Sequence, residues 1–238
     1  MLQLSWNAAV SVATSAGFRK SEMFQSNETT FYLNWDMVAC VVAGAPTSMP
    51  SDAQLKALGE GDFIALTPPP SKSDQFNRVW GAHPLYLPYH NTPRNAARNL
   101  ALLGVKQGLQ HRQQPRSAVF TDSGRQPLKA AHMAAAMYRA MTAIVGPERA
   151  KLFAWHSARI SLATMLYQCK VKPATIQAML RWQTEESLRT YCRLGMADCG
   201  SMLDRAAEAT VAAVQTSNIP VYEQFQFFTA LNSMVEDL

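Results

Sequence analysis

The stretch WDMVACVVA, residues 35–43, decides the fold class, because its run of β-branched and apolar residues is typical of a β-strand. Two further strands are predicted downstream, DFIALT at 62–67 and HPLYLPY at 83–89. The intervening residues 44–62 are rich in Gly, Pro, Ser and Asp, which predicts a loop with a short helix over 52–58. The pattern therefore predicts one small antiparallel sheet of three strands.

Helical periodicity dominates on both sides of these strands. Small and apolar residues recur at helical spacing over 4–16, and Gly17 is a plausible stop signal. From residue 93 onward the pattern predicts helices over 93–108, 127–145, 157–168, 173–180, 184–194, 200–214 and 221–236. We therefore expect an α+β fold that is mainly α: a helical domain over 1–199 with a small three-stranded antiparallel sheet, followed by a helical tail over 200–238.

Composition narrows the class of protein. The chain has 238 residues, 48% of them hydrophobic, which is enough for a sizeable core. It contains no apolar run of the roughly 20 residues that a membrane span needs, and its N-terminus lacks the features of a signal peptide. None of the four cysteines forms a CxxC pair, so neither a zinc site nor a disulfide scaffold is expected. We expect an intracellular protein without a membrane segment, metal or small-molecule cofactor.

Charge is distributed unevenly along the chain. Residues 1–194 hold 21 Lys and Arg against 11 Asp and Glu, whereas residues 195–238 hold 1 against 6. A basic body suits a phosphate backbone, because Lys and Arg displace the counterions condensed on nucleic acid. A solubilising surface is the ordinary alternative. The acidic C-terminal stretch indicates a segment that folds onto the basic body or onto a neighbouring molecule.

Two short motifs place an Arg beside a second polar group. In HSAR, His156 and Arg159 stand three residues apart and share one helix face. Such a His can exchange a proton near neutral pH, and the Arg fork can hold two phosphate oxygens. In SAGFRKSEM, Arg19 and Glu22 are also three apart, which predicts an Arg braced by an acid. Either motif alone is as easily a capping His with a surface Arg, or a surface ion pair.

Three further residues could contribute to chemistry. Lys72 stands in the turn PSKSDQF, 70–76, where a Lys could act as a general acid or simply lie in solvent. In LRWQTEESLRTYCR, 180–193, Trp182 precedes a helix that carries Tyr191. A Trp or Tyr in such a place is commonly a core residue.

Order and spacing together are more specific than any single motif. A Gly-Phe-Arg-x-Ser-Glu stretch after a first helix, a Lys between strands, His-x-x-Arg, Leu-x-Trp and then a Tyr nine residues after the Trp resemble the tyrosine recombinase (phage-integrase-like) family. The resemblance runs in the family's order from about residue 5 to 194. It implies a family set of catalytic residues at Arg19, Lys72, His156, Arg159, Trp182 and Tyr191, with Glu22 as the supporting acid beside the first Arg.

The chain departs from the family pattern at three places. Ile160 follows the second Arg, where a basic or polar residue is usual, and Trp182 replaces the commoner His. The turn that carries Lys72 is long and rich in proline. Because the first motif begins within 20 residues of Met1, we also expect this chain to lack the family's N-terminal core-binding domain.

The resemblance implies a metal-free phosphoryl transfer. Tyr191 would attack a phosphodiester to give a 3′-phosphotyrosyl intermediate and a free 5′-hydroxyl, with the two arginines and His156 binding the phosphate and Lys72 protonating the leaving oxygen. The partners implied are double-stranded DNA and further copies of the chain, about four on DNA, inside the cell where DNA is found (cytoplasmic nucleoid or nucleus). In the family a C-terminal helix often docks on the adjacent protomer. Val221, Phe225, Phe228, Leu231 and Val235 recur at helical spacing, which suits that role or packing on the chain's own domain.

Three other functions are compatible with the sequence. A catalytically weak, DNA-binding remnant would keep the fold without the activity. A type IB topoisomerase would use similar chemistry to relax supercoils, which a supercoiled plasmid without recombination sites would reveal. An unrelated basic helical protein is the remaining alternative.

Overall fold

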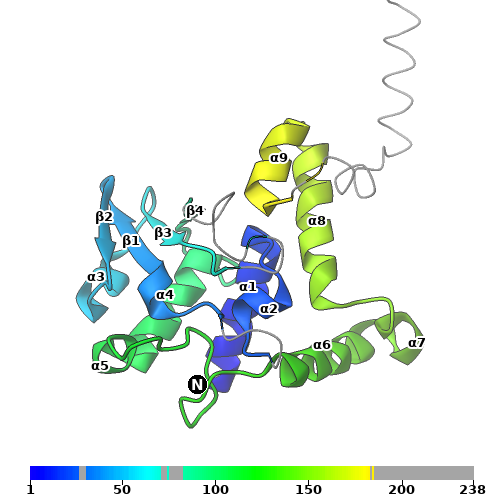
Figure 1. Cartoon of the computed structure of the whole chain (residues 1–238), viewed down its shortest axis with the longest axis horizontal. Coiled ribbons are helices and arrows are strands. Elements are labelled where there is room, and N and C mark those ends of the chain that lie inside the picture. Colours follow the sequence, from blue (N-terminus) through cyan, green and yellow to red (C-terminus); the bar gives the residue numbers. More distant parts are fainter. Residues whose placement is uncertain (27–30, 71–73, 75–82, 183, 185–238) are drawn as a thin grey trace, which may run out of the picture. The chain divides into compact units, whose positions relative to one another are not determined.

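The computed structural model describes residues 1–26, 31–70, 74, 83–182 and 184 (Figure 1). These residues belong to one unit, Met1–Arg193. The fold is α+β. In chain order its elements are α1 (Leu2–Ala16), α2 (Lys20–Met23), the 3-10 turn η1 (Trp35–Met37), β1 (Val38–Val42), β2 (Ala45–Ser48), α3 (Asp52–Ala57), β3 (Phe63–Leu66), β4 (Leu85–Pro88), α4 (Ala96–Gln107), α5 (Leu109–Arg112), α6 (Ala130–Val145), α7 (Pro147–Ala150), α8 (Trp155–Gln168) and α9 (Pro173–Leu180).

The sheet has four antiparallel strands in the order β2-β1-β3-β4, so the expectation of three strands was wrong. The missed strand, β2, lies in the segment predicted as a loop. It pairs with β1 across a two-residue turn in which Ala43 and Gly44 both have positive φ, 49° and 81°, as a tight hairpin of this type requires. Pro46 is tolerated because β2 is an edge strand. Gly44 directly before this short strand and Pro46 within it predicted a loop instead.

Most of the predicted helices that fall in the described residues are present within a few residues of their expected bounds. Helix α9 has the predicted bounds, and α3 begins after Ser51, whose side chain accepts a hydrogen bond from the Gln54 backbone N–H at 3.2 Å. Helix α6 starts later than predicted, because Pro127 is engaged in a bridge with Thr121. The predicted helices at 184–194, 200–214 and 221–236 lie outside the described residues.

Helix α1 organises the larger hydrophobic core. Its Ala8, Ala9, Val12 and Ala13 are almost fully buried, and their small side chains let neighbouring helices approach closely. Helices α4 and α8 both contact α1 and lie on opposite sides of it in Figure 1. The chain therefore brings α8, which carries HSAR, against the helix that precedes SAGFRKSEM.

A second, smaller core joins α8 to α9. It consists of Leu162, Ala163, Ile176, Leu180 and Trp182. This cluster places the residues that follow α9 beside those of α8. Within the described part of the chain, no helix is long and apolar enough to cross a membrane.

Candidate functional site

Gly17 ends α1 and makes room for the site. It has the left-handed conformation, φ 60° and ψ 31°, and its N–H donates to the Ala13 carbonyl at 3.2 Å. A Cβ at this position would lie 2.4 Å from Cδ2 of Leu180, well inside van der Waals contact. Glycine therefore permits both the turn and the close approach of α1 to the end of α9.

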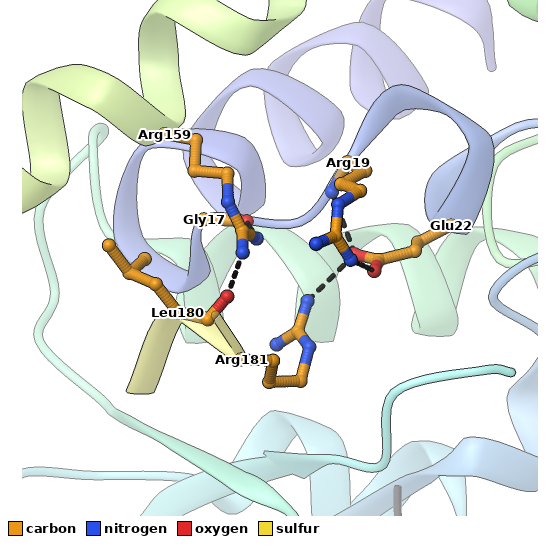
Figure 2. Close-up of polar contacts among 6 residues, drawn as sticks. All are labelled: Gly17, Arg19, Glu22, Arg159, Leu180 and Arg181. Carbon is orange, nitrogen blue, oxygen red and sulfur yellow. Dashed lines mark hydrogen bonds and ion pairs between the residues drawn. The ribbon is translucent and has the colours of Figure 1, made fainter. Parts of the chain in front are cut away.

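Arg159 of α8 connects these two helix ends. Its side chain is fully buried, with Nη1 donating to the Gly17 carbonyl and Nη2 to the Leu180 carbonyl (Figure 2). Its guanidinium carbon lies 5.4 Å from the centre of the Trp182 ring. The second Arg of the predicted set therefore lies at the junction of α1, α8 and α9, where it also organises the backbone.

Arg19 and Glu22 form the braced pair that the sequence predicts. Arg19 precedes α2, and its Nη1 donates to Glu22 Oε1 at 2.9 Å while its backbone N–H donates to Oε2 at 2.7 Å. The Glu22 side chain is 1% exposed, whereas that of Arg19 is 29% exposed. The acid is thus the buried support, and the arginine is the group that reaches solvent.

Arg181 joins this pair, and sequence reasoning did not single it out. Its Nη2 donates to Glu22 Oε2 at 2.7 Å (Figure 2). Its guanidinium carbon lies 4.6 Å from the centre of the Phe18 ring. Arg181 is 6% exposed and caps α9 with φ 53° and ψ 47°. The sequence places Arg181 between the end of a predicted helix and Trp182. A residue that ends a helix in the left-handed conformation is usually Gly or Asn, so an Arg at this position was a possible sign of a special role.

His156 lies in the first turn of α8, exposed to solvent. Its pKa is lowered, chiefly by partial burial and further by the nearby positive charges of Arg159 and Arg19. His156 stands three residues before Arg159 in α8 and lines the same groove as Arg19, so the three groups lie in one region. A neutral imidazole at physiological pH is the form that can accept a proton.

A groove opens beside these residues, with a cavity volume of about 1010 Å³. Arg19, Lys20, Lys129 and His156 line it, together with polar and apolar residues of α2, α6 and the start of α8. Lys20 and Lys129 are both exposed. The groove therefore has a cationic and His-containing lining suited to an anionic ligand.

Trp182 is 5% exposed and lies in the smaller core, with its ring beside Arg159. The structure thus brings Arg19, Glu22, His156, Arg159 and Trp182 into one neighbourhood. Lys72 and Tyr191, the predicted general acid and nucleophile, lie outside the described residues. The segment that contains Lys72 connects β3 to β4, which are antiparallel neighbours.

The arrangement can hold an anion and orient it. Two guanidinium groups, those of Arg19 and Arg181, pair with the Glu22 carboxylate, so these three side chains keep one excess positive charge. Within the described residues, no group of three or more His, Cys, Asp and Glu side chains is placed to bind a metal ion.

Comparisons with protein-family models, with curated proteins and with solved structures gave no match to this chain.

Proposed function

We propose that this chain is a site-specific DNA recombinase of the tyrosine recombinase type, which cleaves and rejoins DNA through a 3′-phosphotyrosyl intermediate without a metal. The observation that supports it best is the convergence of residues far apart in sequence. Arg159 donates to the carbonyl of Gly17, two residues before Arg19, and lies beside Trp182. Four of the six residues expected from the family resemblance thus lie near one junction of helices.

The arginines would bind the scissile phosphate. Arg19, partly exposed at the groove, would donate to non-bridging oxygens and stabilise the charge of the pentacovalent transition state. Arg159 would contribute its positive charge from a buried position, and its hydrogen bonds to the Gly17 and Leu180 carbonyls would hold the ends of α1 and α9 in place. A preorganised cluster of this kind contributes to catalysis because its donors need not reorient during the reaction.

Proton transfer would fall to His156 and Lys72. His156, whose pKa is lowered, would take the proton of the Tyr191 hydroxyl as the phenolate oxygen attacks phosphorus. Lys72 would protonate the departing 5′-oxygen. The energy of the broken phosphodiester is kept in the phosphotyrosine, so that a second 5′-hydroxyl can attack it and rejoin the strand. Recombination by this route takes two duplexes and about four copies of the chain, in the compartment that holds the DNA.

A nicked-substrate trap tests this function. The substrate is a pool of duplexes of randomised sequence, each with a nick. Cleavage beside the nick releases a short fragment that carries the 5′-hydroxyl, so the strand cannot be rejoined and the covalent protein–DNA complex accumulates. We expect the wild-type chain to yield a denaturant-resistant protein–DNA adduct and Tyr191→Phe to yield none. Tyr138→Phe, at an exposed tyrosine of α6, is the matched control and should form the adduct. No adduct with the wild type would reject the enzymatic function, and an adduct with Tyr191→Phe would reject the nucleophile.

One observation favours a second candidate, a DNA-binding remnant without strand cleavage. Both terminal nitrogens of Arg159 donate to main-chain carbonyls, so the guanidinium serves the fold in this structure. If the chain is a remnant, the wild-type protein should bind DNA in a binding assay but give no covalent adduct in the nicked-substrate trap. A recombinase should both bind DNA and give the adduct.

A further inference from the structure

Arg181 is the one buried side chain among the six non-glycine residues with positive φ in the described part of the chain. At φ 53° it occupies the left-handed region, which a side chain makes costly and which glycine adopts freely. The contacts of its buried side chain offset this backbone cost. Its described contacts are the Glu22 carboxylate and the face of Phe18.

Glu22 is shared between two guanidinium groups. Oε1 accepts from the Arg19 side chain, and Oε2 accepts from Arg181 and from the Arg19 backbone N–H. A carboxylate that is 1% exposed needs such partners, because an unpaired buried charge is strongly disfavoured. With both arginines in place, the carboxylate is held in a fixed orientation towards each.

The charge balance explains why a second arginine matters. Arg19 and Glu22 alone would form a neutral pair, in which the carboxylate cancels the attraction of Arg19 for another anion. Arg181 restores a net charge of +1 to the group of three. The Arg181 side chain is 7% exposed and that of Arg19 is 29% exposed. Arg181 therefore supplies buried positive charge, and Arg19 lines the groove.

We propose that Arg181 is a positioning residue for Arg19. By binding Glu22, it fixes the carboxylate that orients Arg19 and keeps Arg19 able to bind a phosphodiester. This assignment rests on the proposed function for its substrate class, since the scissile phosphate is the anion concerned. Arg181 acts through Glu22 and need not touch the phosphate itself.

The test measures phosphodiester binding without requiring cleavage. Dimethyl phosphate, a diester monoanion, is titrated into the full chain, and the Nε–H signal of Arg19 is followed by NMR. We expect Arg181→Gln to weaken binding about tenfold, the scale of one charge-assisted contact, and Arg181→Lys to recover most of the loss. Arg116→Gln is the matched control, because Arg116 is exposed and has a similar φ of 55°.

A double-mutant cycle separates positioning from direct contact. In a Glu22→Gln background the Arg181→Gln change should lose most of its effect, because the carboxylate through which Arg181 orients Arg19 is gone and only the through-space charge of Arg181 remains. An undiminished effect in that background would overturn the positioning role, as would wild-type binding by Arg181→Gln or an equal loss in Arg116→Gln. If Arg181→Gln does not fold, Arg181→Gly, which suits the left-handed backbone, is compared with Arg116→Gly. Binding about tenfold weaker than wild type in Arg181→Gly alone supports the proposal, and binding within about threefold of wild type overturns it.

The proposed function can fail separately. Absence of an adduct from the wild-type chain in the nicked-substrate trap would reject DNA cleavage. The dimethyl phosphate titration and its cycle would still report on Arg181, because neither depends on strand breakage.

Discussion

Arg159 donates a hydrogen bond from Nη1 to the backbone carbonyl of Gly17, a residue 142 positions earlier in the chain. The same guanidinium reaches the Leu180 carbonyl through Nη2. One side chain therefore links α1, α8 and α9, close to Arg19 and Trp182. The stability of the fold and the geometry of the candidate site depend on the same contact.

Replacing Arg159 by Lys should destabilise the protein by about 1–3 kcal/mol, because an ammonium cannot reproduce the planar fork and one buried carbonyl loses its donor. Urea unfolding measures the change. Arg149→Lys, at an exposed arginine of α7, is the matched control and should stay within about 0.5 kcal/mol of wild type. Equal stability of the two variants would show that the carbonyl contacts contribute nothing to folding.

Gly17→Ala should be more destabilising than Gly44→Ala. Both glycines have positive φ, 60° and 81°, so both variants carry backbone strain of about 1–2 kcal/mol. Only at Gly17 does the new methyl group meet a neighbour, Cδ2 of Leu180 at 2.4 Å, whereas nothing lies within 4 Å at Gly44. Overpacking adds about 1–3 kcal/mol at Gly17. Thermal or urea unfolding would contradict this if the two variants lost the same stability.

Glu22→Gln should cost about 3 kcal/mol, because it removes the charge that pairs with buried Arg181 and with Arg19. Glu148→Gln is the matched control, since Glu148 also pairs with a residue three positions away, Lys151, but is 83% exposed. That exposed pair is worth little in water, so its loss should be barely measurable. Denaturant unfolding of both variants compares a buried with an exposed ion pair directly, and a similar loss in both would refute the structural role of Glu22.

The rate of adduct formation should rise with pH through the lowered pKa of His156 and level off near its ordinary value of 6.5. The reason is that a general base must be neutral, and burial with Arg159 and Arg19 favours the neutral form. His156→Gln should remove this rise in rate, whereas His132→Gln, at an exposed position of α6, should keep it. A rate that falls over the same pH range would rule out His156 as the base.

The same shift has a consequence for stability. The folded state binds a proton at His156 less readily than the unfolded state does, so its contribution to folding weakens as pH falls below 6.5. Unfolding of wild type and His156→Gln across this range measures it: the wild type should lose more stability on acidification than the variant.

The sequence by itself determined the local features of this protein. Strands β1, β3 and β4, most of the described helices and the Arg19–Glu22 pair could be predicted, because each depends on residue type and spacing within a short segment. The edge strand β2 could not, since Gly44 and Pro46 indicate a loop unless the partner strand is known. The proposed roles of Lys72 and Tyr191 stay predictions, because both residues lie outside the described part of the chain.

Only the tertiary structure decided which distant groups meet. The ion pair between Arg181 and Glu22 spans 159 residues, and the position of Arg181 between a predicted helix and Trp182 does not reveal which carboxylate it binds. Burial selects its partner, because a guanidinium excluded from water must find a carboxylate and an aromatic face. For the same reason Arg159, predicted to face a phosphate, has its terminal nitrogens bonded to the Gly17 and Leu180 carbonyls: the packing of α1 and α9 against α8 places those acceptors within its reach.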